Sequence, residues 1–237
     1  YVDGAGTVIS GGGKVVKNAA GFDLPKLMVG SLGRYGILAE LTFKVFPKPS
    51  HQLTVRVECP SHTEAMERLM QSASKRWELE ALDYRTNESA LYLRFAGPLE
   101  AIQQLATESI AQWPNQAELL DSTQAEMFWD KLREGLWPTA DQSCLTKVPT
   151  LPQQFLEWVK PIQKHAELHL TAGGATAWLA HTPDANDAIA QILTAHQLGG
   201  LVIRGESNAL FLGDHPTSPI HDRIKQALDP SQRFPSF

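Results

Sequence analysis

The residues best suited to hold a ligand form a glycine-rich run at positions 30–37, which reads Gly-Ser-Leu-Gly-Arg-Tyr-Gly-Ile. Nine of the seventeen glycines of the chain fall within its first 48 residues. Glycines this dense are typical of places where the backbone approaches a ligand closely or adopts a positive φ. Free N–H groups in such a turn could bind a pyrophosphate or the carbonyl oxygens of a flavin. A tight packing corner without a ligand explains the same run equally well, so both interpretations stay open.

Three common binding or catalytic motifs are each nearly present but lack a required residue. Val15 follows Lys14, where a phosphate-binding loop needs Ser or Thr. Ile9 stands where the third glycine of a dinucleotide-binding fingerprint belongs. Ser207 lies in a sequence close to the esterase motif G-x-S-x-G, but Ala209 replaces the last glycine. The sequence therefore argues against a phosphate loop, a dinucleotide fingerprint and a serine hydrolase.

Histidines and cysteines do not form a recognisable metal site. His165 and His169 are four positions apart, but no carboxylate at ligand spacing completes a zinc site. We interpret both as surface or structural histidines. Cys59 and Cys144 are 85 positions apart, which argues against a disulfide framework or a self-contained cluster and indicates a reducing cytosol. No metal site is expected, no residue stands out as a catalytic base, and the catalytic residues stay unassigned.

Composition sets further limits on function. The 237 residues are 43% hydrophobic and 20% charged, which is typical of a soluble globular protein with a sizeable core. Lys and Arg number 21 against 26 Asp and Glu, and this net charge of −5 argues against binding to nucleic acid or an anionic membrane surface. The most apolar stretch, residues 27–45, is interrupted by glycines and charges, so no transmembrane segment is expected. Because the chain begins in a glycine-rich turn without Met, we expect a piece of a longer protein.

Short elements flank the glycine-rich run. Asp23 and Pro25 predict a short helix that begins at residue 24, with Asp23 as its N-cap. Residues 41–45 alternate apolar and polar side chains, as a half-buried strand does. Prolines at 47 and 49 end this strand and indicate a domain boundary. We therefore expect two domains, residues 1–48 and 49–237.

Beyond this boundary the sequence predicts a mixed α+β domain with two similar halves. The first half follows the order β-α-β-β-α, most of a ferredoxin-like unit, at residues 53–57, 61–74, 79–84, 90–95 and 98–112. The order partly recurs at residues 143–148, 152–165, 168–171, 176–180, 185–196, 201–204 and 209–212. We expect the two halves to share one antiparallel sheet. The helix predicted between them, at 126–133, carries Phe128 and Trp129, which we interpret as core rather than as a cofactor platform.

Two segments resemble a known family of flavoproteins. Residues 14–27 (KVVKNAAGFDLPKL) match the pattern KN-x-x-G-[YF]-D-L, and residues 30–41 (GSLGRYGILAEL) match GS-x-G-x-x-G-[IV]. Both patterns are similar to those of FAD-linked oxidases of the vanillyl-alcohol-oxidase (PCMH) type, among them the FAD-binding subunits of glycolate-oxidase complexes. Weaker matches follow at residues 128–133, 173–179 and 228–234. Ala177 replaces a usual Arg, and Pro-Ser-Phe replaces the usual NPGR ending.

The resemblance implies a fold and a set of cofactor contacts. Residues 1–48 would be the end of a PCMH-type FAD-binding domain, its second lobe, and residues 49–237 a ferredoxin-like cap over the flavin ring. The implied FAD contacts, made largely through the backbone, are Asn18, Gly21, Asp23, Ser31, Gly33, Gly36 and Ile37. Asp23 is explained equally well as a helix cap alone. Because the glycine loop of the family's first lobe has no match, we expect this chain to bind FAD weakly or not at all and to be inactive alone.

The resemblance also implies an activity and partners. It implies an FAD-dependent oxidoreductase that oxidises a small 2-hydroxy acid (glycolate) to a 2-oxo acid (glyoxylate) and passes the electrons onward. Because two distant cysteines cannot hold a cluster, we expect an iron–sulfur subunit as a partner, together with a larger flavin subunit. The expected location is the cytoplasm, or the inner membrane periphery through the complex. Two alternatives stay open, namely a non-catalytic assembly subunit of the same complex and a stand-alone FAD oxidase of a sugar or alcohol.

Overall fold

The chain is divided into two compact units. The computed structural model describes residues 1–12, 23–138, 142–207, 209–215 and 219–236. One unit comprises Tyr1–Pro47 together with Pro216–Phe237, and the other comprises Lys48–His215. The boundary expected at residue 48 therefore lies beside the observed one. The C-terminal segment, which we expected in the second domain, belongs instead to the first unit.

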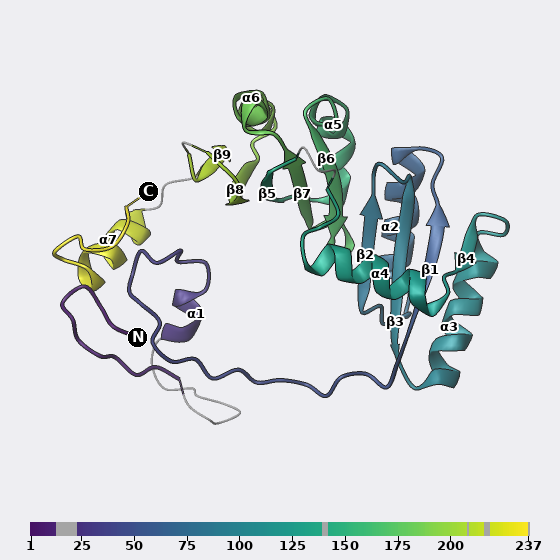
Figure 1. The fold of residues 1–237 in the computed structure, drawn as a ribbon, viewed down its shortest axis with the longest axis horizontal. Helices are drawn as coiled ribbons and strands as arrows, with labels where there is room; N and C mark the ends of the chain where they lie inside the picture. The colour runs from purple at the N-terminus through teal and green to yellow at the C-terminus, as the bar shows by residue number, and fades with distance from the viewer. Residues whose placement is uncertain (13–22, 139–141, 208, 216–218, 237) are drawn as a thin grey trace. The chain divides into compact units, whose positions relative to one another are not determined.

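The larger unit is built on one antiparallel sheet, which has nine strands among the described residues (Figure 1). The strands are β1 (His51–Glu58), β2 (Ala81–Arg85), β3 (Ala90–Gly97), β4 (Ala117–Leu119), β5 (Cys144–Pro149), β6 (Ala166–Thr171), β7 (Thr176–His181), β8 (Gly199–Arg204) and β9 (Phe211–Gly213). They lie in the order β4-β1-β3-β2-β6-β7-β5-β8-β9. The mixed α+β class predicted from the sequence is confirmed.

The two halves of this sheet repeat the same order of elements. The first half is β1-α2-β2-β3-α3-β4 and the second is β5-α5-β6-β7-α6-β8, with α4 between them. The helices are α2 (His62–Ser74), α3 (Leu99–Gln112), α4 (Ser122–Arg133), α5 (Pro152–Ile162) and α6 (Asn186–Ala195), with 3₁₀ turns η1 (Ala172–Gly174) and η2 (Pro183–Ala185). In each half the first strand lies between the third and the fourth, as β4-β1-β3-β2 and β8-β5-β7-β6. Pairing of β2 with β6 joins the halves, so both share one sheet as predicted.

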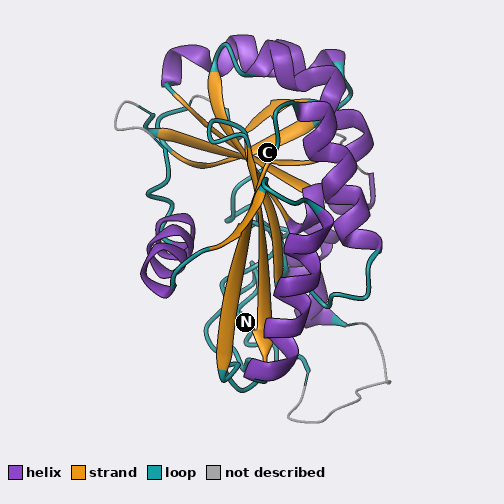
Figure 2. Ribbon diagram, turned by 90° about the vertical axis from the view of Figure 1, so that its right-hand side faces the viewer, coloured by secondary structure: helices purple, strands orange, loops and turns teal. Residues whose placement is uncertain are grey.

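Helices cover the two faces of the sheet unequally. α2, α3, α5 and α6 lie on one face, whereas α4 crosses the other (Figures 1 and 2). Successive residues of a strand point to opposite faces, so β3 contributes to both sides. Leu91 and Leu93 pack in the core beneath the four helices, while Tyr92 stacks on Phe128 of α4 with 3.8 Å between ring centroids. Trp129 is buried in the same small cluster, so the prediction that this aromatic pair packs in the protein is confirmed.

The prediction of a strand at residues 41–45 is wrong. Residues 38–49 have no regular structure, and the Phe43 and Val45 side chains are 76% and 80% exposed. Ile37 makes an isolated bridge with Val2, but no described residue pairs with 41–45. A strand is stable only where a neighbour completes its backbone hydrogen bonds. The alternation of side chains is therefore present in the sequence without the pairing that would make it a strand.

The smaller unit brings the two ends of the chain together. It contains α1 (Leu24–Met28) and α7 (Pro219–Leu228). The N–H of Gly4 donates to the carbonyl of Leu228 at 2.8 Å, and Lys225 Nζ donates to the carbonyl of Arg34 at 3.0 Å. None of the helices in the described ranges is both long and apolar enough to cross a membrane.

A buried carboxylate fixes the chain after α7. Asp229 is fully buried and accepts hydrogen bonds of 2.9 Å from the backbone N–H groups of Arg233 and Phe234. It also pairs with Lys225. Burial by itself raises the pKa of Asp229, but the hydrogen bonds from Lys225 and the two backbone amides outweigh it and lower this pKa to about 2. The charged form of Asp229 is therefore the one that the fold stabilises.

Replacing Phe155 by alanine should lower the free energy of unfolding by about 3–5 kcal/mol, because it opens a cavity in the main core. The Phe155 side chain is fully buried and packs edge-on against Tyr84 and Trp158. Leu156 is the matched control, since it is 39% exposed on the same helix and L156A should cost much less. Urea unfolding of the two variants checks this, and equal losses would contradict the burial described here.

Acid should loosen the smaller unit through protonation of Asp229. Because the folded state holds the Asp229 pKa at about 2, below its ordinary value of 3.8, its contribution to stability is complete above pH 4 and is lost as the pH falls through 2. Hydrogen exchange at the Gly4 amide, measured across this range, reports the loss. D229N should exchange faster at neutral pH and show a weaker dependence on pH. Equal exchange in D229N and the parent at neutral pH would contradict this role of Asp229.

Candidate functional site

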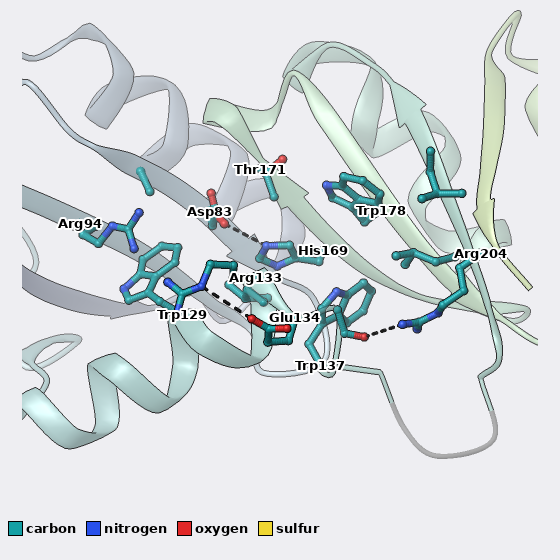
Figure 3. A pocket seen from close by; sticks show the side chains of 15 residues that line it. Asp83, Arg94, Trp129, Arg133, Glu134, Trp137, His169, Thr171, Trp178 and Arg204 are labelled. Carbon is teal, nitrogen blue, oxygen red and sulfur yellow. Dashed lines mark hydrogen bonds and ion pairs between the residues drawn. The ribbon is translucent and has the colours of Figure 1, made fainter. Parts of the chain in front are cut away.

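A cavity of about 740 Å³ lies in the larger unit on the face of the sheet that α4 crosses (Figure 3). Three groups of residues line it: Ala81, Asp83 and Arg94 from β2 and β3; Trp129, Leu132, Arg133, Glu134, Gly135 and Trp137 from α4 and the turn after it; Leu145, His169, Thr171, Trp178, Ile203 and Arg204 from the second half of the sheet. The volume lies within the range of small-molecule sites, about 300–1,000 Å³. Both halves of the sheet therefore contribute to one ligand-sized site.

The pairing of β2 with β6 determines which side chains reach this cavity. Tyr84 pairs with Leu170 and Arg85 pairs with His169 in the register of these strands. Tyr84 and Leu170 point into the main core, so the alternate residues face the cavity. Asp83 and His169 are diagonal neighbours on that side, close enough for their side chains to interact. The Nε2 atom of His169 lies 2.9 Å from Oδ2 of Asp83.

His169 is held as a neutral imidazole in a defined tautomer. Burial lowers its pKa below the ordinary value, and the opposing effect of Asp83 does not cancel this shift. A neutral imidazole has one N–H group, and the Asp83 carboxylate can only accept, so the proton lies on Nε2. The Nδ1 atom is then an acceptor, and it is buried without a hydrogen-bond partner among the described residues. The cavity thus has an unused hydrogen-bond acceptor in its wall.

The cavity lining carries more positive than negative charge. Its charged residues are Arg94, Arg133 and Arg204 against Asp83 and Glu134, and this excess contrasts with the net charge of −5 of the whole chain. Arginine binds planar anions such as carboxylates through paired N–H groups. The lining therefore offers guanidinium groups to a small anion, with Arg94 also paired with Glu80 and Arg133 with Asp130.

Aromatic rings and hydrogen bonds hold the arginines in place. The guanidinium of Arg94 lies 4.2 Å from the ring centre of Trp129 and its Nε is 2.8 Å from a carboxylate oxygen of Glu80. Nη1 of Arg204 donates to the carbonyl of Gly135 at 3.1 Å. Stacking and hydrogen bonds of this kind reduce the side-chain freedom that a ligand would otherwise have to restrict. The cationic groups are thus positioned before a ligand arrives.

The helix that closes one side of the cavity is anchored through Trp129. Its indole N–H donates to the hydroxyl of Thr54 on β1 at 2.9 Å. At the start of α4, Asp121 and Gln124 form a capping box, in which each side chain binds the other's backbone N–H. Both contacts fix the position of α4, and hence of the turn that follows it.

The cofactor contacts implied by resemblance lie in the smaller unit, not in this cavity. Asn18 and Gly21 fall outside the described residues. Oδ1 of Asp23 accepts the backbone N–H of Lys26 at 3.1 Å, so Asp23 is the N-cap of α1. This geometry agrees with the interpretation of Asp23 as a helix cap. A contact between Asp23 and FAD stays a prediction.

The glycine-rich run folds into a turn whose glycines have two different explanations. Gly33 has a φ of +79°, and a Cβ there would meet no atom within 4 Å, so conformation rather than packing favours glycine. At Gly36 a Cβ would lie 2.7 Å from the carbonyl oxygen of Val2, so close packing excludes a side chain. Ser31 is buried, whereas Ile37 is 60% exposed. The packing-corner interpretation thus accounts for Gly36, while the backbone at Gly33 is open to a ligand.

The cavity contains residues that the motif search did not single out. His169 was interpreted as a surface or structural residue, and Asp83 and Arg94 matched no motif. His169 lies 86 positions after Asp83, so no local pattern connects them. The detectable signal is the alternation of polar and apolar residues in two strands, with Asp83 in ALDYR and His169 in AELHLT. His165, which lies four positions before His169 in the sequence, is exposed and lies outside β6.

Within the described ranges no three His, Cys, Asp or Glu residues come together as a metal site.

Fold and cavity together define a mixed α+β chain with a cavity of ligand size whose lining includes three arginines. Along 98% of its length the chain is 30% identical to glycolate oxidase subunit GlcE of Escherichia coli (strain K12). The aligned region covers 61% of that relative, so the chain spans about three fifths of its length. No protein-family model matches the sequence.

Two further relatives match shorter regions. Glycolate oxidase subunit GlcD of Bacillus subtilis (strain 168) is 46% identical over 50 residues, 21% of this chain and 11% of the relative. D-lactate dehydrogenase of Archaeoglobus fulgidus is 31% identical over 70 residues, 30% of this chain and 16% of the relative. These similarities confirm the resemblance to glycolate oxidase subunits that the motifs indicated.

His169 should remain uncharged in the folded chain below the pH at which an ordinary histidine titrates, near 6.5. Because its folded pKa is lowered, protonation favours the unfolded state, and stability should fall as the pH drops below 6.5. Asp83 raises this pKa, so D83N should lower it further. The pH dependence of the imidazole NMR signals measures both values. A His169 that titrates at or above 6.5 would contradict a neutral, buried imidazole.

Proposed function

We propose that this chain is the C-terminal part of an FAD-binding subunit in a glycolate-oxidase-like complex. The proposed reaction is oxidation of a small 2-hydroxy acid to a 2-oxo acid. The observation that carries this proposal is the similarity to a glycolate oxidase subunit along 98% of the chain. The cavity supports it, since arginines and a neutral histidine suit a ligand with both a carboxylate and a hydroxyl group.

The smaller unit is proposed as the end of a PCMH-type FAD-binding domain and the larger unit as the cap. The turn at Ser31, Gly33 and Gly36 would contribute to holding FAD, together with Asn18, Gly21, Asp23 and Ile37. The fit rests on Gly33, where nothing lies within 4 Å of an added Cβ and a ligand has room beside the backbone. When bound, FAD supplies a two-electron acceptor for the hydride of the substrate. The residues of the chain itself would bind and orient the acid and exclude water.

Electron transfer would require partners. Cys59 and Cys144 are both buried as free thiols, and an iron–sulfur cluster needs several cysteine ligands. We therefore propose an iron–sulfur subunit and a larger flavin subunit as the onward path for electrons. The shorter similarity to a second glycolate oxidase subunit supports an assembly of related chains. The proposed location is the cytoplasm, or the inner membrane periphery through this complex.

A non-catalytic assembly role is weakened by the position of Ala177. This residue departs from the arginine usual in the family, but it is fully buried in the main core. Its neighbour Trp178 points to the opposite face and lines the cavity. The departure therefore lies away from the proposed site and does not remove a group from it.

The visible spectrum of the full-length protein tests the proposal. Under anaerobic conditions glycolate should bleach the visible absorption band of the flavin, because a reduced flavin absorbs weakly there. A band that persists with glycolate and with lactate would contradict oxidation of these acids by this subunit, and no band at all would favour the assembly role. The 237-residue chain is the control and should retain FAD weakly or not at all. Tightly held, stoichiometric FAD in that chain would contradict its incomplete enclosure of the cofactor.

A further inference from the structure

The unused acceptor on His169 requires an explanation of its own. Its Nδ1 atom is buried, and none of the described residues offers it a hydrogen bond. A buried acceptor without a partner is costly, so such atoms are normally satisfied by a ligand or an ordered water. His169 lines the 740 Å³ cavity, where Figure 3 shows its ring between Asp83 and Trp137. The partner of Nδ1 is therefore expected to enter from this cavity.

Asp83 determines which kind of group can bind to Nδ1 of His169. Its carboxylate accepts the N–H of Nε2 at 2.9 Å and thereby fixes Nδ1 as an acceptor. Nδ1 can consequently bind a hydroxyl or amine group but not a carbonyl oxygen. The arginines of the lining add a second preference, because a guanidinium group binds a carboxylate. A hydroxy acid meets both requirements, whereas a 2-oxo acid or an unsubstituted acid meets only the second.

We propose that His169 is a specificity-determining residue for hydroxy acids, that it accepts the ligand's hydroxyl hydrogen at Nδ1, and that Asp83 is its positioning residue. Arg94, which lies two strands from His169 in the order β3-β2-β6, holds the carboxylate of the same ligand. This inference deepens the proposed function and rests on it for the choice of a 2-hydroxy acid. It concerns binding by this chain alone, so it can be tested without flavin.

Three acids of nearly equal size separate recognition of the hydroxyl from recognition of the carboxylate. Lactate has the hydroxyl, propanoate lacks it, and pyruvate presents a carbonyl oxygen in its place. The cavity is large enough for the methyl group that lactate adds to glycolate. Titration of the 237-residue chain, followed by NMR, should show one lactate enantiomer binding about tenfold more tightly than propanoate or pyruvate, since the latter two leave Nδ1 unpaired. The Nδ1 resonance of His169 should shift on saturation with lactate.

Variants assign the effect to individual residues. D83N keeps the shape of the side chain but removes the charge that fixes the tautomer, so the preference for lactate over pyruvate should fall from tenfold toward onefold. D184N makes the same chemical change at an exposed carboxylate outside the cavity lining and should keep the preference. R94Q should weaken all three acids by a similar factor, because it removes a contact to the carboxylate. The nitrogen shifts of His169 report its tautomer in each variant.

The outcomes separate this inference from the proposed function. Equal affinities for the three acids, or no binding, together with an unchanged Nδ1 resonance would overturn the inference and assign an ordered water to that atom. An unchanged preference in D83N would overturn the role of Asp83. Bleaching of flavin in the full-length protein without any hydroxyl preference would overturn the inference while the proposed function stands. A preference for lactate without bleaching would support the inference and contradict the proposed oxidation.

Discussion

The pairing of β2 with β6 is the interaction on which the larger unit depends. It joins two similar halves into one sheet through the pairs Tyr84–Leu170 and Arg85–His169. The same register sends Tyr84 and Leu170 into the main core and brings Asp83 beside His169 on the other face. A shift by one residue would exchange the faces, burying polar groups in the core and exposing apolar ones. Stability of the core and geometry of the cavity are therefore set by one constraint.

The two faces of the sheet are specialised by what covers them. Four helices close one face over a continuous apolar core, whereas α4 covers only part of the other. The uncovered part leaves room for buried and half-buried polar side chains, which are tolerated because they have partners, as in Arg94 with Glu80 and Trp129 with Thr54. His169 Nδ1 and Arg85 Nη1 depart from this pattern, because both are buried without a hydrogen-bond partner among the described residues. An atom of this kind in a cavity wall is consistent with a site whose partner is a ligand.

The smaller unit depends on a different type of contact. Its first and last segments are joined by hydrogen bonds from Gly4 to Leu228 and from Lys225 to Arg34. Asp229 fixes the residues after α7 through its buried carboxylate. The sequence motif around Leu228 and Asp229, which resembled a family ending, thus has a structural role in closing the unit. The turn at residues 30–37, for which a contact with FAD is proposed, lies in this unit.

Local interactions are what the sequence by itself determined. Asp23 caps α1 as predicted, and the sequence located eight of the nine strands in the described residues, because caps and strand patterns depend on neighbours along the chain. The missed strand is β4, which has three residues and pairs with β1 along the edge of the sheet. Tertiary structure decided the rest: residues 41–45 are not a strand because no described residue pairs with them, and Asp83 meets His169 across 86 positions. Pairing between distant segments carries no local signature, so the cavity emerged only once the sheet was assembled.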